Sequence, residues 1–171
     1  NMKRERLHFQ PSPKGNPVKA SLLVVAFLCM SAWASAQVAD YAFSQSNGTY
    51  AAITGTTVFS SGWDDNVATY NIPSGTFTFN GTAYNYVKVN SNGYVTFGTT
   101  TSSTTSYTPI SSTTGYAGAI SAFGIDLDDG TSSSVVATQS GGEVIIQWIN
   151  ARRRNGDALN WQIRLNQTTG S

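Results

Sequence analysis

One stretch decides the fold class of this chain: LNWQIRL at residues 159–165, in which apolar and polar residues alternate strictly. A period of two places the apolar side chains on one face of a β-strand and the polar ones on the other. Just upstream, VIIQWI at residues 144–149 has apolar residues on both faces. Coverage on both faces is typical of a central strand, whereas 159–165 has one buried face and one wet face.

The same pattern of strands and turns continues through the chain. β-Branched and aromatic residues are plentiful, and no window sustains an apolar period of 3.6 residues. Further predicted strands are Tyr41–Ser44, Thr56–Ser60, Ala68–Ile72, Thr76–Asn80, Tyr84–Asn90, Tyr94–Phe97, Ala119–Asp126 and Ser134–Gln139. The turns predicted between strands are Asn80-Gly81, Ser91-Asn92-Gly93, Asp129-Gly130, Gly141-Gly142 and Asn155-Gly156. Short strands at this spacing predict an all-β fold, an antiparallel β-sandwich of jelly-roll or immunoglobulin-like type.

Two segments qualify this fold prediction. Residues 99–114 are rich in Ser and Thr, and we expect them either to cross between sheets or to form an exposed loop. Residues 166–171 have the composition of a turn that leads to another strand. We therefore expect the domain to be truncated, with its C-terminal strand or strands missing.

The beginning of the chain has the parts of a secretory signal peptide. Basic residues precede an apolar run, SLLVVAFLCMSAW at residues 21–33, and Ala34 and Ala36 supply the small residues of a cleavage site. The apolar run is shorter than the roughly 20 residues that a membrane-spanning helix needs. We predict a signal peptide at 1–36 and an extracellular domain at 37–171, secreted or on the outer cell surface, with no membrane span after cleavage.

The composition of residues 37–171 excludes most enzyme classes. His8 and Cys29 both lie in the leader, so the domain lacks the groups of Ser-His-Asp and Cys-dependent catalysis and the usual zinc ligands. Carboxylate chemistry remains, but no spacing of the acidic residues picks out a glycosidase pair. Five basic and eight acidic side chains give this part a net charge of about −3, which does not favour nucleic acid. We predict no enzymatic activity and no nucleic-acid partner.

The most acidic run, Asp126-Leu127-Asp128-Asp129-Gly130, is a candidate calcium site. Ca²⁺ prefers oxygen ligands on a loop, and Asp126, Asp128 and Asp129 would supply them. The spacing departs from the EF-hand pattern, in which a Glu provides the last ligand. The alternative is a solvated turn after the preceding strand, with Asp129-Gly130 making the bend. No cofactor is expected apart from this ion.

Two further candidates each have a functional and a structural interpretation. In the functional interpretation, Trp63 is an exposed ring beside the polar Asp64 and Asp65, the combination that sugar-binding surfaces use. In the structural interpretation, Trp63 plugs the edge of the sandwich and the acidic groups face water. The run Arg152-Arg153-Arg154 either binds an anion or a partner, or forms a solvated hairpin end that pairs with Asp157 or Glu143.

Many of these segments carry a resemblance to a known module. They are Tyr41–Tyr50, Ile53–Thr56, Trp63–Asp65, Phe77–Gly81, Val89–Gly98, Ile120–Asp126, Val144–Arg153 and Leu159–Leu165. The chain resembles the N-terminal β-sandwich of large secreted and surface proteins of the Bacteroidetes, many of which are sorted by type IX secretion. More loosely, it is similar to extracellular NIDO-type domains, in which an N-G-x-[IV]-x-F-G element occurs, here Asn92–Gly98. The resemblance implies an extracellular, non-catalytic module.

The function predicted from these observations is structural or adhesive. The domain would belong to a larger secreted or cell-surface protein, with other domains of the same chain as its partners. The alternative is a carbohydrate-binding, lectin-like module that contacts surface glycans or proteins, as an accessory to a glycan-active enzyme domain downstream. The exposure of Trp63 discriminates between the two, because a sugar platform needs an exposed ring.

Overall fold

The computed structural model describes residues 43–112, 114–153 and 156–170. The predicted signal peptide, with Ala34 and Ala36, and the start of the first predicted strand lie outside these residues. No helix in the described part has the length and hydropathy of a membrane span. The strands are β1 Thr56–Phe59, β2 Val67–Asn71, β3 Phe77–Phe79, β4 Thr82–Tyr84, β5 Tyr86–Asn90, β6 Tyr94–Phe97, β7 Gly118–Ser121, β8 Leu127–Ser140, β9 Glu143–Arg153 and β10 Ala158–Asn166, with a 3-10 turn at Pro109–Ser111.

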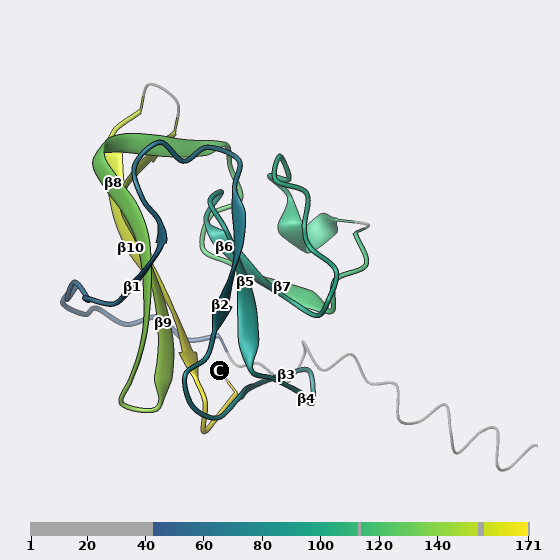
Figure 1. Cartoon of the computed structure of the whole chain (residues 1–171). Helices are drawn as coiled ribbons and strands as arrows, with labels where there is room; N and C mark the ends of the chain where they lie inside the picture. Colours follow the sequence, from purple (N-terminus) through teal and green to yellow (C-terminus); the bar gives the residue numbers. More distant parts are fainter. Residues whose placement is uncertain (1–42, 113, 154–155, 171) are drawn as a thin grey trace, which may run out of the picture. The chain divides into compact units, whose positions relative to one another are not determined.

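Two four-stranded antiparallel sheets make up the fold (Figure 1). Sheet A has the strand order β1-β8-β9-β10, sheet B has the order β2-β5-β6-β7, and the β3-β4 hairpin forms a separate two-stranded sheet. One cluster of buried apolar side chains contains residues from both four-stranded sheets, so their inner faces pack on each other. The antiparallel, all-β sandwich expected from the sequence is confirmed.

The two stretches that predicted the fold are the neighbours β9 and β10 of sheet A. In β10, Ile163 and Leu165 are buried while Asn160 and Arg164 are exposed, as the alternation predicts. In β9, every residue from Val144 to Trp148 is buried. The expected coverage of this central strand on both faces is therefore confirmed.

Aromatic rings fill much of the core. Phe97 of β6 stacks on Phe77 and Phe79 of β3, with ring centroids 5.5 and 4.5 Å apart. Trp148 of β9 stacks on Trp161 of β10 at 5.3 Å. Each large apolar side chain contributes about 1.5–3 kcal/mol when it is fully buried. These rings therefore attach the β3-β4 hairpin to sheet B and hold β9 and β10 of sheet A together.

Three of the predicted turns join neighbouring strands as expected, Ser91-Asn92-Gly93 among them, a fourth prediction is wrong, and Asn155 of the fifth lies outside the described residues. Asn80-Gly81 joins β3 to β4 with φ angles of 47° and 72°, and Gly141-Gly142 joins β8 to β9 with φ angles of 60° and 80°. Asp129-Gly130 lies inside β8 instead, because β8 begins at Leu127 and pairs with the end of β9. Glycine is needed there for close approach, since a Cβ on Gly130 would stand 2.5 Å from the carbonyl oxygen of Asn150.

Strand boundaries differ from the predictions at three other places. β7 ends at Ser121 rather than Asp126, and residues 122–126 lead as a loop into β8. The predicted strand Tyr84–Asn90 is divided, its first residue ending β4 and the rest forming β5. Phe43 and Ser44 have no regular structure. The turn predicted after β10 is present at residues 167–170.

A long irregular segment covers the outer face of sheet B. Residues 99–117 join β6 to β7 within this sheet, so the Ser/Thr-rich segment does not cross between sheets. Ser102 of this segment is buried, and the Tyr94 hydroxyl donates a hydrogen bond to the carbonyl of Ser106 at 3.1 Å. The buried hydroxyl of Tyr94 is thus satisfied by the covering loop.

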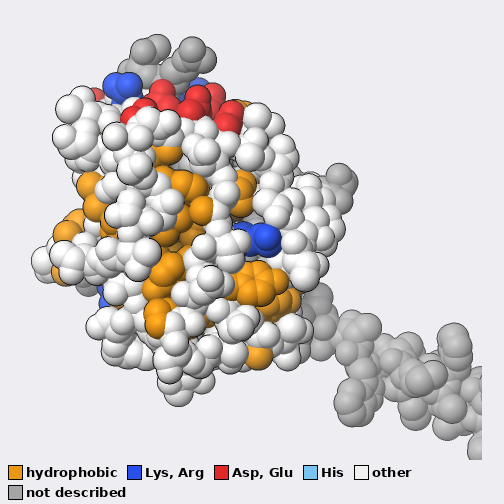
Figure 2. All heavy atoms as spheres, viewed as in Figure 1, with side chains coloured by type: hydrophobic (Ala, Val, Ile, Leu, Met, Phe, Trp, Pro, Cys, Tyr) orange, Lys and Arg blue, Asp and Glu red, His pale blue; other side chains and the backbone are white. Residues whose placement is uncertain are grey.

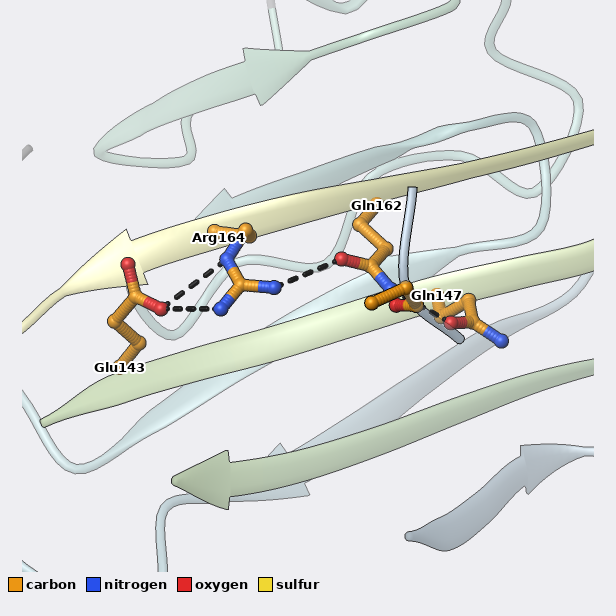
Figure 3. Close-up of polar contacts among 5 residues, drawn as sticks. Glu143, Gln147, Gln162 and Arg164 are labelled. Atoms are coloured by element: carbon orange, nitrogen blue, oxygen red, sulfur yellow. Dashed lines mark hydrogen bonds and ion pairs between the residues drawn. The ribbon is translucent and has the colours of Figure 1, made fainter. Parts of the chain in front are cut away.

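A shorter segment, residues 51–53, lies on the outer face of sheet A, and we call it the strap. The amide of Ile53 donates to the side-chain oxygen of Gln147 at 2.9 Å, and Gln162 donates to the carbonyl of Ala51 at 2.7 Å. Figure 3 shows how Gln162 also joins Gln147 to Arg164, which pairs with Glu143 at 2.6 Å. A row of polar contacts along β9 and β10 therefore ends on the backbone of the strap.

Candidate functional site

Two segments that the sequence nominated separately meet at one end of the sandwich. Asp64 and Asp65 lie between β1 and β2, and Asp126 lies just before β8. One carboxylate oxygen from each lies within 4.8 Å of the other two. Asp64 and Asp126 are exposed, whereas Asp65 is partly buried. Figure 2 shows the acidic side chains gathered at this end, which we call the acidic end.

Backbone contacts bring the first of these segments to the start of β8. Asp64 forms an antiparallel bridge with Asp128, and the amide of Asp129 donates to the carbonyl of Trp63 at 3.1 Å. The side chain of Asp129 in turn accepts a hydrogen bond from the amide of Gly62. The β1-β2 loop therefore behaves as a short extension of sheet A.

The buried side chain of Asn92 ties three loops together. Its amide nitrogen donates to Asp65 at 3.0 Å and to the carbonyl of Thr104 at 2.9 Å, while its oxygen accepts from the amide of Leu127 at 2.9 Å. Asn92 is 0% exposed, so its side chain depends on these protein partners rather than on water. A buried amide with all three partners in place stabilises one arrangement of the loops over others.

The neighbours of Asn92 in the β5-β6 turn extend this network. Ser91 exchanges hydrogen bonds with Asn66, through its hydroxyl at 2.8 Å and its amide at 2.9 Å. The carbonyl of Ser91 accepts from the indole of Trp148 at 3.2 Å. Asn90 accepts from the amide of Asn92 at 2.8 Å. The turn is therefore bonded both to the acidic end and to the core of sheet A.

Tyr107 completes the surroundings of Asp65. Its hydroxyl donates to the two carboxylate oxygens of Asp65 at 3.2 and 3.4 Å. Loss of hydration, followed by the negative charges of Asp65 and Asp126, raises the pKa of Tyr107 from 10.0 to about 12. The phenol therefore stays a neutral donor over the physiological pH range.

A family model described as NIDO related matches residues 40–171. The chain belongs to the NIDO-related family. The match takes in every strand from β1 to β10 and the whole acidic end. None of the curated proteins and none of the solved structures compared with the chain is significantly similar to it. Membership of this generally non-enzymatic family indicates a non-catalytic β-module.

The NIDO-like element Asn92–Gly98 has a clear structural role in this NIDO-related domain. Asn92 is the residue that ties the three loops, and Phe97 carries the aromatic stack with β3. Gly93 has a φ of 90°, and a Cβ there would stand 2.7 Å from the Cβ of Phe123. Asn92, Gly93 and Phe97 of the element therefore each meet a packing or hydrogen-bonding requirement.

Trp63 is only 3% exposed and belongs to the core of the NIDO-related domain. Its ring therefore presents no face to a sugar, and the interpretation in which it plugs the sandwich fits its position. Asp64 and Asp65, by contrast, do reach the acidic end. The sequence could not distinguish these outcomes, because an aromatic residue before acidic ones is compatible with either.

The three aspartates proposed as calcium ligands are not brought together as a set. Asp126 joins Asp64 and Asp65, whereas Asp128 pairs with Arg152 at 3.1 Å and Asp129 is bonded to Gly62. In the basic run, Arg152 pairs with Asp128, whereas Glu143, one of its two expected partners, pairs with Arg164 instead. Arg154 lies outside the described residues.

Sequence reasoning missed two residues of the site, Asn92 and Tyr107. Asn92 was recognised as part of a turn and of the NIDO-like element, but no pattern indicated its three partners. Tyr107 lies in the Ser/Thr-rich segment, which carries no regular periodicity. The acidic end offers oxygen ligands and hydrogen-bond acceptors but no imidazole or thiol, since residues 37–171 contain no His and no Cys.

Proposed function

We propose that this NIDO-related domain is an extracellular, non-catalytic module with a structural and adhesive role in a larger secreted or cell-surface protein. The observation that carries the proposal is the acidic end, where Asn92 holds three loops in one arrangement. Loops positioned by a rigid sandwich are the usual contact surfaces of such folds. The partners are other domains of the same protein and surface proteins or glycans.

Export is the first part of the proposal to test. The leader at residues 1–36 supports it, and so does the resemblance to Bacteroidetes proteins sorted by the type IX route. When the full chain is produced in a bacterium, N-terminal sequencing of the exported protein should give Gln37 as the first residue. Replacing Ala36 with Leu should leave the precursor uncut, because signal peptidase requires small residues. An uncut wild-type chain in the cytoplasm would contradict the proposal.

A calcium ion is the ligand that we propose for the acidic end. Three carboxylate oxygens within 4.8 Å repel one another, and oxygen ligands of one Ca²⁺ ion lie at comparable separations. We expect Ca²⁺ to raise the melting temperature, and Asp126→Asn to abolish this increase. Asp157→Asn is the matched control, because it removes one exposed acidic charge from another loop. An equal effect of both variants would show that only net charge matters.

Adhesion is tested by a glycan and protein array with the full chain, with and without Ca²⁺. Saturable binding that is lost in Asp126→Asn but kept in Asp157→Asn would place the contact at the acidic end. The carbohydrate-binding alternative is weakened by the burial of Trp63. Binding to glycans alone, unaffected by Asp126→Asn, would favour a sugar site elsewhere and contradict the proposed contact.

A further inference from the structure

The chain contains four Asn-Gly dipeptides, at 47–48, 80–81, 92–93 and 155–156. In this dipeptide the backbone nitrogen of glycine can attack the side-chain carbonyl carbon of asparagine, because no Cβ obstructs its approach. Asparagine is for this reason one of the thermolabile residues of proteins. The reaction requires the two atoms to reach a near-attack geometry, so the surrounding structure decides its rate.

Asn47-Gly48 lies in a part of the chain that permits this geometry. Both residues are exposed and outside regular structure. A Cβ added to Gly48 would meet nothing within 4 Å, which shows that the space around the dipeptide is open. Neither the Asn47 side chain nor the Gly48 amide forms a hydrogen bond with another described residue. The dipeptide precedes the strap, which is the first fixed point of the chain beyond it.

Asn92-Gly93 is the opposite case. All three polar bonds of the Asn92 side chain are to groups of other loops, and the amide of Gly93 donates to the carbonyl of Asn90 at 3.2 Å. Rotation of the carboxamide toward Gly93 would break these hydrogen bonds. Asn80-Gly81 is intermediate, since the pairing of Phe79 with Thr82 fixes both ends of its two-residue turn.

We propose that Asn47 is a site of spontaneous deamidation and isoaspartate formation, and that the fold protects Asn92 from the same reaction. The Gly48 nitrogen forms a bond to Cγ of Asn47 and loses its proton, while the C–N bond of the carboxamide breaks and ammonia leaves. Water then opens the resulting succinimide at either carbonyl, giving aspartate or isoaspartate. Each event adds one negative charge to the segment that leads to the strap.

The test is to incubate the full chain at mildly alkaline pH, once folded and once in urea, and to follow each dipeptide by peptide mass spectrometry. In urea, we expect Asn47 and Asn92 to convert at similar rates. In the folded protein, Asn47 should convert nearly as fast as in urea, and Asn92 should convert at least tenfold more slowly than Asn47. The variant Gly48→Val, whose side chain obstructs the attack, should abolish conversion at Asn47 alone.

Two outcomes would overturn the inference. One is a folded protein in which Asn47 is as stable as Asn92, which would mean that other parts of the chain shield it. The other is conversion of Asn92 at the rate of Asn47 without loss of the native circular-dichroism spectrum, because the bonds of Asn92 would then offer no protection.

Discussion

Two turns of this NIDO-related domain have similar backbones and very different surroundings. Gly141-Gly142 joins β8 to β9 at the end of sheet A away from the acidic aspartates; both glycines are exposed, and a Cβ on either would meet nothing within 4 Å. Ser91-Asn92-Gly93 joins β5 to β6 and is wholly buried, with bonds to three loops and to Trp148. The first turn only reverses the chain, whereas the second also organises the acidic end.

The sharpest way to test this difference is to place the same methyl group in both turns. Gly142→Ala meets only the backbone penalty of a positive φ, about 1–2 kcal/mol. Gly93→Ala adds a clash with Phe123 and should lose about 3–4 kcal/mol in total. Urea unfolding of both variants measures the comparison. Equal losses would show that the buried turn is no more constrained than the exposed one.

The next largest effect is expected for Asn92→Asp, which keeps the shape of the side chain and removes its donors. Asp65 would then face a second carboxylate at about the same 3.0 Å, and the carbonyl of Thr104 would lose its partner. We expect a loss of about 2–3 kcal/mol at neutral pH.

The loss in Asn92→Asp should shrink as the pH falls toward about 4, because a protonated carboxyl regains a donor. Asn47→Asp is the matched control, since it makes the same chemical change at an exposed position and should alter stability by less than about 0.5 kcal/mol. A penalty for Asn92→Asp that does not depend on pH would rule out charge repulsion as its cause.

Some properties of the domain are determined by neighbouring residues in the sequence. The alternation of 159–165, the doubly apolar 144–149 and the Gly141-Gly142 turn each predict their structure correctly, because periodicity and φ preference are properties of neighbouring residues. The composition also predicts a module without His or Cys chemistry, and this stays a prediction.

The acidic end could not be predicted in the same way, because it depends on contacts between distant residues. Asp65, Thr104 and Leu127 are all bonded to Asn92, and no local pattern in the sequence indicates this set of contacts. Asp129-Gly130 was mistaken for a turn for a related reason. Its glycine is required by the neighbouring β9 backbone rather than by the local chain direction.

A smaller effect is expected at the strap, which is held by side chains rather than by strand pairing. Gln147→Ala leaves the amide of Ile53 without its acceptor and removes one partner of Gln162, so we expect a loss of about 1–2 kcal/mol. Limited proteolysis should cut residues 43–55 faster in this variant. Gln139→Ala is the control, because Gln139 bonds to Ser74 and Gln167 instead and its removal should leave the strap protected.

The smallest loss of stability is expected for Tyr107→Phe, and this loss should shrink in alkali. The folded-state pKa of Tyr107 lies above 10.0, so the folded protein holds the phenol proton more tightly than the unfolded chain. The resulting stability is complete below pH 10 and disappears as the pH rises from 10 to about 12. Tyr107→Phe should remove one high-pH step from the tyrosine absorbance titration. Loss of a step near pH 10 instead would contradict the contact between Tyr107 and Asp65.

The strap has a consequence for the order in which this protein can fold. Its two hydrogen bonds join residues that are 94 and 111 positions apart, and among the described strands β1 pairs with β8 alone. Because the chain is made from its N-terminus, β1 cannot pair and the strap cannot form its hydrogen bonds until β8, β9 and β10 have all been synthesised. Contacts of such long range form slowly, because loop closure precedes any gain from them. The first strand of sheet A is thus the earliest to leave the ribosome and among the last to find its place.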